Sequence, residues 1–339
     1  MFTERTSVGL DVHARSVVGA AIDTVAGQVS RRTMAPALAF AEVLEWLASL
    51  AGPVAVVYEA GPTGYGLARV LRERGIRCEV AAASRLPRQP GDRRKNDRRD
   101  ALKLANALRA DQVVGVEVPS VVREDARDLV RTADDARIEL MAARQRLSMM
   151  LVRHGLVYYG GSTWTVAHDR WLRTQRALLS GVGTLAAFDD YYETVVAQTA
   201  RRDRLREKVL ELAAGSEFTE VTRRLACVRG ITDFTGFALA VEIGQWDRFS
   251  GSSIGAYLGL APGESSSGES TRRTPITRDG NTHARRLLVE AAWHQHRLYR
   301  PGIELRRRWA RVDPVIVARA DRANRRLARR RANLLDRGK

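Results

Sequence analysis

Four acidic residues are spaced as the ligands of a metal-dependent phosphoryl-transfer site would be. Asp11 and Glu59 each follow an apolar, β-branched run that is typical of a buried strand. Asp97 and Asp100 stand three positions apart at the start of a predicted helix, which places them on one face. Carboxylates are the hard ligands that Mg²⁺ prefers, and two such ions can stabilise the attacking and leaving oxygens of a phosphate. The pattern therefore indicates a two-metal magnesium site, although each acid alone could be a turn, surface or helix-capping residue.

A serine-rich segment, Ser265–Gly268, offers a nucleophile. It lies between an apolar helix and the basic stretch Thr271–Arg273. A serine hydroxyl attacks phosphorus only when it is deprotonated or faces a phosphate whose charge is neutralised, which metal ions and arginines can do. The same composition is common in flexible linkers, so the residues by themselves leave both interpretations open.

The charge balance makes a nucleic acid the expected partner. The chain has 56 Lys and Arg against 39 Asp and Glu, a net charge of +17, and residues 305–339 alone supply +10 of it. Each phosphate neutralised by Lys or Arg releases counterions, so this balance favours DNA or RNA over solubility alone or an anionic membrane. The residues that we expect to contact nucleic acid are Arg93, Arg94, Lys95, Arg98, Arg99, Arg272, Arg273, Arg278, Asn281, Arg285, Arg286, Arg325, Arg326, Arg329 and Arg330.

The acids need a scaffold of alternating strands and helices, which residues 1–118 are predicted to supply. Three early strands, a helix, a strand, a helix, a strand and a last helix fit a ribonuclease-H-like mixed sheet. The predicted strands are Thr6–Val12, Val17–Ile22, Gln28–Met34, Val54–Tyr58 and Arg77–Ala81. The predicted helices are Ala37–Leu50, Gly66–Arg74 and one that follows the basic segment Arg85–Arg99 and continues to Ala110.

The rest of the chain is predicted to be helical, so the fold class is α/β followed by α. Residues 119–216 are rich in helix formers and charges and indicate an antiparallel or coiled-coil-like arm, in which Trp164, Trp171, Tyr191 and Tyr192 are expected to pack rather than to stack on bases. Residues 217–339 form a third predicted domain. Its elements are two short helices around Gly230 that resemble a helix-hairpin-helix, a helix at Ser252–Leu260, a loop or hairpin at Pro262–Asn281, a helix at Thr282–Tyr299 and basic C-terminal helices.

Cysteine, histidine and hydropathy patterns exclude several other classes of site. Cys78 and Cys227 lack the spacing of a zinc knuckle or of a disulfide scaffold, which favours a reducing cytoplasm. None of the six histidines, His13 included, has zinc spacing with a cysteine, and we expect them to be structural or surface residues. No apolar run is long enough to span a bilayer, so we expect no membrane contact.

Motifs at both ends of the chain resemble those of one enzyme family. The segments SVGLDVHARSV, VYEAGPTGYGLARVL and KNDRRDALKLA carry the acids, and LACVRGITDFTGFALAVEIGQWDRF, AYLGLAPGESSSGESTRR and ITRDGNTHARRLLVEAA follow in the same order as in the family. In this order they resemble the Asp-Glu-Asp-Asp transposases of insertion sequences, the family numbered one hundred and ten with its eleven-eleven subgroup. The resemblance covers about two-thirds of the chain and leaves the helical middle least constrained.

The resemblance implies a RuvC-like N-terminal domain, a coiled-coil arm and a C-terminal transposase domain that donates a serine. It implies Mg²⁺ dependence, guidance by a structured bridge RNA, and a bacterial, nucleoid-associated setting. The family pattern places the nucleophile directly before a glycine, at Ser267, with Ser266 as the runner-up. Here Glu269 and Thr274–Pro275 stand where the family often has glycine. The acids and the serine are far apart in the sequence, so they must be brought together by folding or by another subunit. A dimer or tetramer is expected, because strand exchange needs several cut DNA ends held at once.

Two other functions remain open at this point. One is a metal-dependent junction resolvase in which water attacks and the serine loop only binds. The other is a nucleic-acid-binding scaffold without catalysis, which the presence of all four acids makes less favoured.

Overall fold

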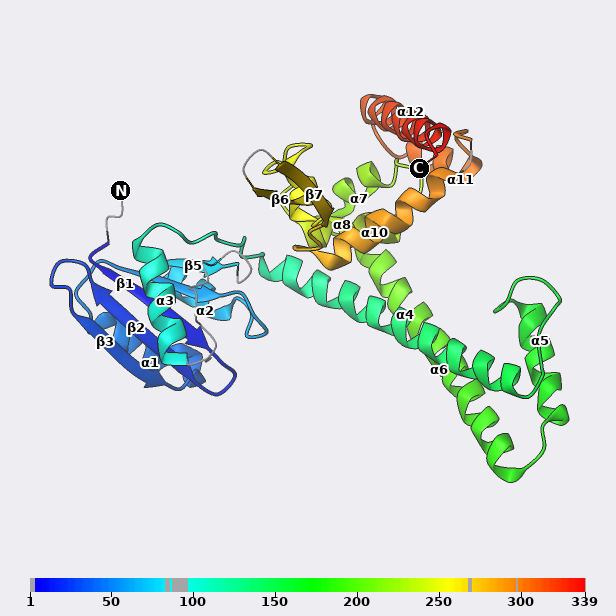
Figure 1. The fold of residues 1–339 in the computed structure, drawn as a ribbon, viewed down its shortest axis with the longest axis horizontal. Helices are drawn as coiled ribbons and strands as arrows, with labels where there is room; N and C mark the ends of the chain where they lie inside the picture. The colour runs from blue at the N-terminus through cyan, green and yellow to red at the C-terminus, as the bar shows by residue number, and fades with distance from the viewer. Residues whose placement is uncertain (1–3, 83–85, 87–96, 268–269, 297, 339) are drawn as a thin grey trace. The chain divides into compact units, whose positions relative to one another are not determined.

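The computed structural model describes residues 4–82, 86, 97–267, 270–296 and 298–338. The chain divides into two compact units, Met1–Ser120 and Val121–Lys339 (Figure 1). Arg93, Arg94 and Lys95, which we predicted to bind nucleic acid, lie outside the described residues.

The first unit is built on a five-stranded mixed sheet with the strand order β3-β2-β1-β4-β5. The two ladders β1–β2 and β2–β3 are antiparallel, whereas β1–β4 and β4–β5 are parallel. The strands are β1 (Thr6–Val12), β2 (Val17–Asp23), β3 (Val29–Met34), β4 (Val54–Glu59) and β5 (Arg77–Ala81), and the helices are α1 (Ala37–Ala48), α2 (Gly66–Glu73) and α3 (Asp97–Arg109). The mixed α/β prediction is confirmed, and this arrangement is compatible with a RuvC-like domain.

Alternation along β1 gives each face of the sheet its own helices. Val8 and Leu10 are fully buried in the core that includes Trp46 of α1 and Leu71 of α2. The other face packs against α3, where Leu104 is buried together with Ala55 and Val57 of β4. One strand therefore separates two cores.

The second unit begins with two long helices that pack side by side (Figure 1). These are α4 (Val121–Arg153) and α6 (Val182–Ala214), with α5 (Val166–Gln175) and a 3₁₀ turn (Arg176–Leu178) between them in sequence. Their distal core contains Leu147 of α4, Leu172 of α5 and Phe188 of α6. Trp164, Trp171, Tyr191 and Tyr192 pack against this core, in agreement with the packing role predicted for them.

A second core in this unit surrounds α8 (Asp233–Ile243), whose Phe237, Leu239 and Val241 are fully buried. The remaining elements are α7 (Thr219–Leu225), α9 (Ser253–Tyr257), the antiparallel hairpin of β6 (Pro262–Ser267) and β7 (Ser270–Ile276), α10 (Thr282–Trp293), a 3₁₀ turn (His294–His296), α11 (Ile303–Trp309) and α12 (Pro314–Asp336). The predicted helix Thr282–Tyr299 is shorter in the structure, because regular α-helix ends at Trp293.

The fold buries both cysteine thiols of the chain. Cys78 and Cys227 are free and buried. Burial raises the pKa of the Cys78 thiol to about 12, and it raises the pKa of the Cys227 thiol as well. Within the described part of the chain, none of the helices combines the length and the apolar character needed to cross a membrane.

Candidate catalytic site and nucleic-acid-binding residues

The ends of β1 and β4 bring two of the predicted acids to one edge of the sheet. The strands pair in parallel with Leu10 opposite Tyr58, so Asp11 and Glu59 are the next residues along each strand. Parallel neighbours end on the same side of a sheet. Asp11 is partly buried and Glu59 is exposed there.

Close packing against Gly9 holds α3 beside these strand ends. A Cβ atom at Gly9 would overlap the carbonyl oxygen of Ala101 and would lie 2.5 Å from the backbone nitrogen of Ala105. Glycine lets the helix backbone approach the strand directly. Asp97 and Asp100, in the first turn of α3, are thereby fixed relative to Asp11 in the same unit.

Asp11, His13 and Asp97 form a cluster that could hold a metal ion. Their ligand atoms all lie within 4.8 Å of one another. His13 Nε2 is 3.2 Å from Asp11 Oδ2 and 3.8 Å from Asp97 Oδ2. Asp11 Oδ2 and His13 Nε2 are both inaccessible to solvent and have no hydrogen-bond partner of acceptable geometry. Buried polar atoms in this state are suited to binding a cation.

The donor set fits a divalent metal ion. Two carboxylates supply the hard oxygen ligands that suit Mg²⁺ and Mn²⁺, and one imidazole supplies a nitrogen ligand, which transition-metal ions accept more readily than Mg²⁺ does. A divalent metal is also what the resemblance to Asp-Glu-Asp-Asp transposases implied. Asp11, His13 and Asp97 are therefore compatible with the divalent metal ion that the sequence predicted.

Glu59 and Asp100 lie near this cluster in the fold but are not part of it. Asp100 is on α3 and accepts a hydrogen bond from Lys103 Nζ at 3.2 Å. Glu59 is the last residue of β4. Their roles as metal ligands therefore remain predictions. His13 was not predicted to belong to the site, although its position two residues after Asp11 at the end of a strand was a usable signal.

Most of the predicted nucleic-acid contacts that the structure describes are exposed, but several are engaged within the protein. Arg98 and Arg99 are exposed on the first turn of α3, and Arg272 and Arg273 are exposed on β7. Arg285 Nη1 instead donates a hydrogen bond to the carbonyl oxygen of Leu258 at 2.8 Å. Arg278 is exposed and has a positive φ of 60°.

Ser265, Ser266 and Ser267 lie on β6, one strand of the β6–β7 hairpin. Ser267 pairs with Ser270 and Ser266 with Thr271 along the β6–β7 ladder. Ser266 Oγ donates a hydrogen bond to Glu264 Oε1 at 2.6 Å. Gly268, Glu269 and the side chain of Ser267 lie outside the described residues. The prediction of a loop or hairpin is thus resolved as a hairpin.

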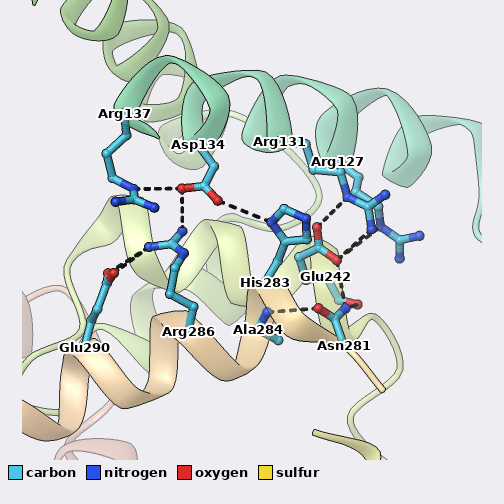
Figure 2. Close-up of polar contacts among 10 residues, drawn as sticks. All are labelled: Arg127, Arg131, Asp134, Arg137, Glu242, Asn281, His283, Ala284, Arg286 and Glu290. Atoms are coloured by element: carbon cyan, nitrogen blue, oxygen red, sulfur yellow. Dashed lines mark hydrogen bonds and ion pairs between the residues drawn. The ribbon is translucent and has the colours of Figure 1, made fainter. Parts of the chain in front are cut away.

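The helix α10 follows the hairpin in the sequence, and a buried carboxylate on α8 contacts the residue that caps its start (Figure 2). Glu242 on α8 is fully buried, and its carboxylate accepts hydrogen bonds from Arg131 Nε at 2.9 Å and Asn281 Nδ2 at 2.8 Å. Arg127 Nε lies 3.8 Å away. Asn281 also caps α10, because its Oδ1 accepts the backbone N–H of Ala284. One chain of polar contacts therefore links α4, α8 and α10.

Burial and pairing act in opposite directions on Glu242. Burial alone would raise the pKa of its carboxyl, but hydrogen bonds from Arg131 and Asn281 and the charges of Arg131 and Arg127 outweigh it. The pKa lies below its ordinary value as a result. Glu242 is thus charged at neutral pH.

A second carboxylate, Asp134 on α4, connects to α10 further along the helix (Figure 2). It pairs with Arg137 at 2.8 Å and with Arg286 at 2.9 Å, and His283 Nδ1 lies 3.4 Å away. Arg286 also pairs with Glu290 at 2.8 Å. The contacts of Asn281 and Arg286 with protein groups show a structural use for two residues predicted to bind nucleic acid.

The C-terminal helix α12 has one face against the protein and one exposed basic face. Asn324 is fully buried, and its side chain accepts the backbone N–H of Arg229 at 2.9 Å. Arg325 pairs with Asp321 at 2.8 Å. Arg326, Arg329 and Arg330 are exposed. The basic face predicted from the sequence is therefore available on this helix.

Comparison with known proteins assigns both halves of the chain to one family. Residues 8–155 match a family described as "Transposase" of the DEDD and IS110 type, and residues 222–306 match the "Transposase IS116/IS110/IS902 family". The chain is 38% identical over 285 residues to a putative transposase, y4qE, of Sinorhizobium fredii, an alignment that covers 83% of this chain and 69% of that protein. It is 30% identical over 298 residues to the transposase for insertion sequence element IS1533 of Leptospira borgpetersenii, covering 86% and 83%.

A third relative represents the subgroup that the sequence motifs indicated. The chain is 24% identical over 202 residues to the transposase for insertion sequence element IS1111A of Coxiella burnetii, which covers 58% of this chain and 54% of that protein. The matched regions contain the acidic strand ends, α3 and the β6–β7 hairpin. The chain therefore belongs to the IS110/IS116/IS902 family of transposases, DNA-acting enzymes of insertion-sequence transposition.

Proposed function

We propose that this transposase cuts and joins DNA through a transient phosphoserine, with Asp11, Glu59, Asp97 and Asp100 holding Mg²⁺ ions and Ser267 as the nucleophile. The observation that carries the metal-dependent part is the cluster of Asp11, His13 and Asp97, in which Asp11 Oδ2 and His13 Nε2 are buried and lie 3.2 Å apart without a hydrogen bond. Bound divalent ions would neutralise charge on the scissile phosphate and stabilise the oxygens around it.

In the proposed first step, Ser267 Oγ bonds to phosphorus while the bond from phosphorus to one sugar oxygen breaks. The departing sugar oxygen leaves as a hydroxyl, and the serine proton is lost. In the second step a sugar hydroxyl of another strand attacks the phosphoserine, which joins the strands and restores the serine. Arg272 and Arg273, exposed on β7, supply charge that can hold phosphate oxygens near the hairpin.

The wider setting of this reaction is also part of the proposal. A structured guide RNA would select the DNA sites, and a dimer or tetramer would hold several DNA ends at once in the bacterial cytoplasm at the nucleoid. The support is the net charge of +17, which suits binding of more than one nucleic-acid strand.

Trapping a protein–DNA adduct that survives denaturation tests the nucleophile. With the element's own DNA ends, its RNA and Mg²⁺, the wild-type protein should give a covalent adduct on a denaturing gel. Mass spectrometry should place the DNA on the peptide that contains Ser267. Ser267→Ala should lose cleavage, joining and adduct together, whereas Ser266→Ala should keep most activity.

Two results would replace this mechanism. Nicking that needs Mg²⁺ and survives both serine substitutions would favour a resolvase-like reaction in which water attacks. DNA and RNA binding without any cleavage, under conditions in which a related transposase is active, would favour a scaffold. An adduct on Ser266 would move the nucleophile by one residue and keep the mechanism.

A further inference from the structure

A pocket of about 480 Å³ opens on the helical arm of the second unit. Its walls come from α4, α5, α6 and the residues just before α5, and they include Trp164, Leu172, Val195 and Val196. The volume lies within the range of roughly 300–1,000 Å³ that is typical of small-molecule sites. Its walls are largely apolar, so it is suited to a flat ring rather than to a solvated ion.

Arg144 places a guanidinium group, which can donate hydrogen bonds, in the wall of this apolar pocket. Its guanidinium carbon lies 4.9 Å from the centre of the Trp164 ring. Its Nε is inaccessible to solvent and has no hydrogen-bond partner. A buried N–H without an acceptor costs free energy, which an acceptor on a bound ligand would recover.

The backbone at Trp164 is held in a strained conformation. Its φ is 61°, a value that bulky side chains rarely adopt. The Trp164 N–H donates a hydrogen bond to Nδ1 of His168, a residue that is only 4% exposed and whose ring stacks on Trp171. Strain kept in place by such contacts is concentrated at ligand-binding sites.

Two carboxylates on the wall determine which ligand fits. Asp169 and Asp203 both line the pocket, and Asp169 already accepts hydrogen bonds from Tyr192 and Arg173. Both carboxylates are paired with arginines, Asp169 with Arg173 and Asp203 with Arg202, so they offer hydrogen-bond acceptors on the wall rather than uncompensated negative charge. A nucleobase is neutral and planar, and its edge presents acceptors for Arg144 together with donors for a carboxylate.

We infer that this pocket binds one unpaired nucleobase, which stacks on Trp164 and accepts a hydrogen bond from Arg144, so that Trp164 both packs against the arm core and, contrary to the sequence prediction, contacts a base. The base comes either from a single-stranded segment of DNA or from RNA. The site is separate from the acidic cluster and the serine hairpin, and the inference does not depend on the chemistry proposed for them.

Binding of short single-stranded oligonucleotides, with EDTA present to prevent cleavage, tests the inference. The full-length protein should bind base-containing oligonucleotides about five- to a hundredfold more tightly than matched abasic ones, the range expected from stacking one base. This preference should fall close to one in Arg144→Ala and Trp164→Ala. Arg146→Ala removes the same charge from an exposed position on α4 and should keep the preference.

A photocross-link locates the base and identifies its source. Oligonucleotides that carry 5-iodouridine or 5-iododeoxyuridine should cross-link to the peptide containing Trp164, and DNA and RNA of the same sequence are compared side by side. A cross-link with DNA alone, with RNA alone or with both supports the pocket. The comparison shows which nucleic acid can supply the base. Trp164→Phe, which keeps an aromatic ring, should retain part of the preference if Trp164→Ala is poorly folded.

The inference fails if Arg144→Ala binds base-containing and abasic oligonucleotides with the wild-type ratio. It also fails if cross-links fall only on peptides outside the pocket lining. Ser267→Ala and Asp11→Ala should retain the base preference, so failure of the proposed catalytic mechanism would leave this result unaffected.

Discussion

The imidazole of His13 lies within 4 Å of a carboxylate oxygen of Asp11 and of Asp97. In this position it can either ligate a metal ion or hold the two carboxylates in place. In either case, loss of the imidazole should weaken metal binding. Substitution of residues that hold metal ligands in place lowers metal affinity by about 10- to 100-fold.

We therefore predict that His13→Ala raises the Mg²⁺ concentration needed for half-maximal DNA cleavage by about 10-fold or more. Cleavage measured over a Mg²⁺ titration checks this, and oligonucleotide binding in EDTA should stay as in the wild type. His154→Ala, at an exposed position directly after α4, is the matched control. An unchanged Mg²⁺ dependence in His13→Ala would exclude His13 from the site.

The sequence singled out the four acids as candidates but not His13, whose place two residues after Asp11 was the only local signal for it. Asp11 and Glu59 follow β-branched runs, and Asp97 and Asp100 share a helix face, so local patterns mark all four as candidate ligands, of which Asp11 and Asp97 lie in the cluster with His13. His13 comes after the strand, where no periodicity fixes the direction of a side chain. Its contact with Asp97 depends on α3, which follows 84 positions later.

At the scale of elements, the contact between Gly9 and α3 determines the position of Asp97. A methyl group at position 9 would overlap Ala101 and force α3 away from β1. Added atoms in a packed core usually cost about 1–3 kcal/mol, and here the neighbour is helix backbone, which cannot rotate aside.

Gly9→Ala should therefore lower the free energy of unfolding by about 2 kcal/mol or more and weaken metal-dependent cleavage beyond what the lost stability explains. Thermal unfolding and cleavage at a temperature where both proteins are folded check this. Gly66→Ala is the control, because its added Cβ would meet only an ordinary contact at 3.9 Å. Equal melting temperatures for Gly9→Ala and the wild type would contradict the close packing.

The buried carboxylate of Glu242 links three helices of the second unit. Replacing it with glutamine keeps the shape but leaves Arg127 and Arg131 without their charge partner. Breaking a buried ion pair from one side typically costs about 3–5 kcal/mol.

We predict that Glu242→Gln lowers the free energy of unfolding by about 3 kcal/mol at neutral pH. The pKa of Glu242 is lowered in the folded state, so its contribution is complete above the ordinary value of 4.5 and is lost as pH falls through the lowered value. The difference in melting temperature between wild type and variant should therefore narrow below about pH 4.5. A difference that stays constant down to pH 3 would mean that the charge of Glu242 does not stabilise the fold.

Strands and helices of the first unit were largely predictable, but the polar network of the second was not. The five predicted strands match the structure to within one residue at each end, because β1, β2 and β4 are buried apolar runs and glycine or proline stands before β3, β4 and β5. Glu242 stands in the apolar segment VEIGQW, and its partner Arg131 lies 111 positions earlier. Such pairs form only through tertiary packing, so local sequence patterns do not predict them.

For the molecule as a whole, the largest local concentration of charge is the C-terminal segment with α12. Deleting this helix would also remove Asn324, which is buried and hydrogen-bonded to the Arg229 backbone. Substitution is therefore the cleaner test of nucleic-acid contact.

Changing Arg326, Arg329 and Arg330 together to glutamine should weaken DNA binding and reduce the slope of log K against log salt by up to about three units, at roughly 0.9 for each phosphate contact. Binding measured over a salt series checks this. The triple lysine variant keeps the charge and should keep the slope. If the glutamine variant has the wild-type slope, this face of α12 does not contact phosphates.

The two native cysteines have a practical consequence for labelling chemistry. Maleimides react with accessible thiolates, and Cys78 and Cys227 are both buried with raised thiol pKa values. A cysteine introduced at an exposed position in each unit, such as Arg74→Cys and Arg153→Cys, should therefore react first under brief treatment at neutral pH. Fluorophores at this pair would report changes in distance between the units as DNA is added, with every native residue outside the two labelled positions retained.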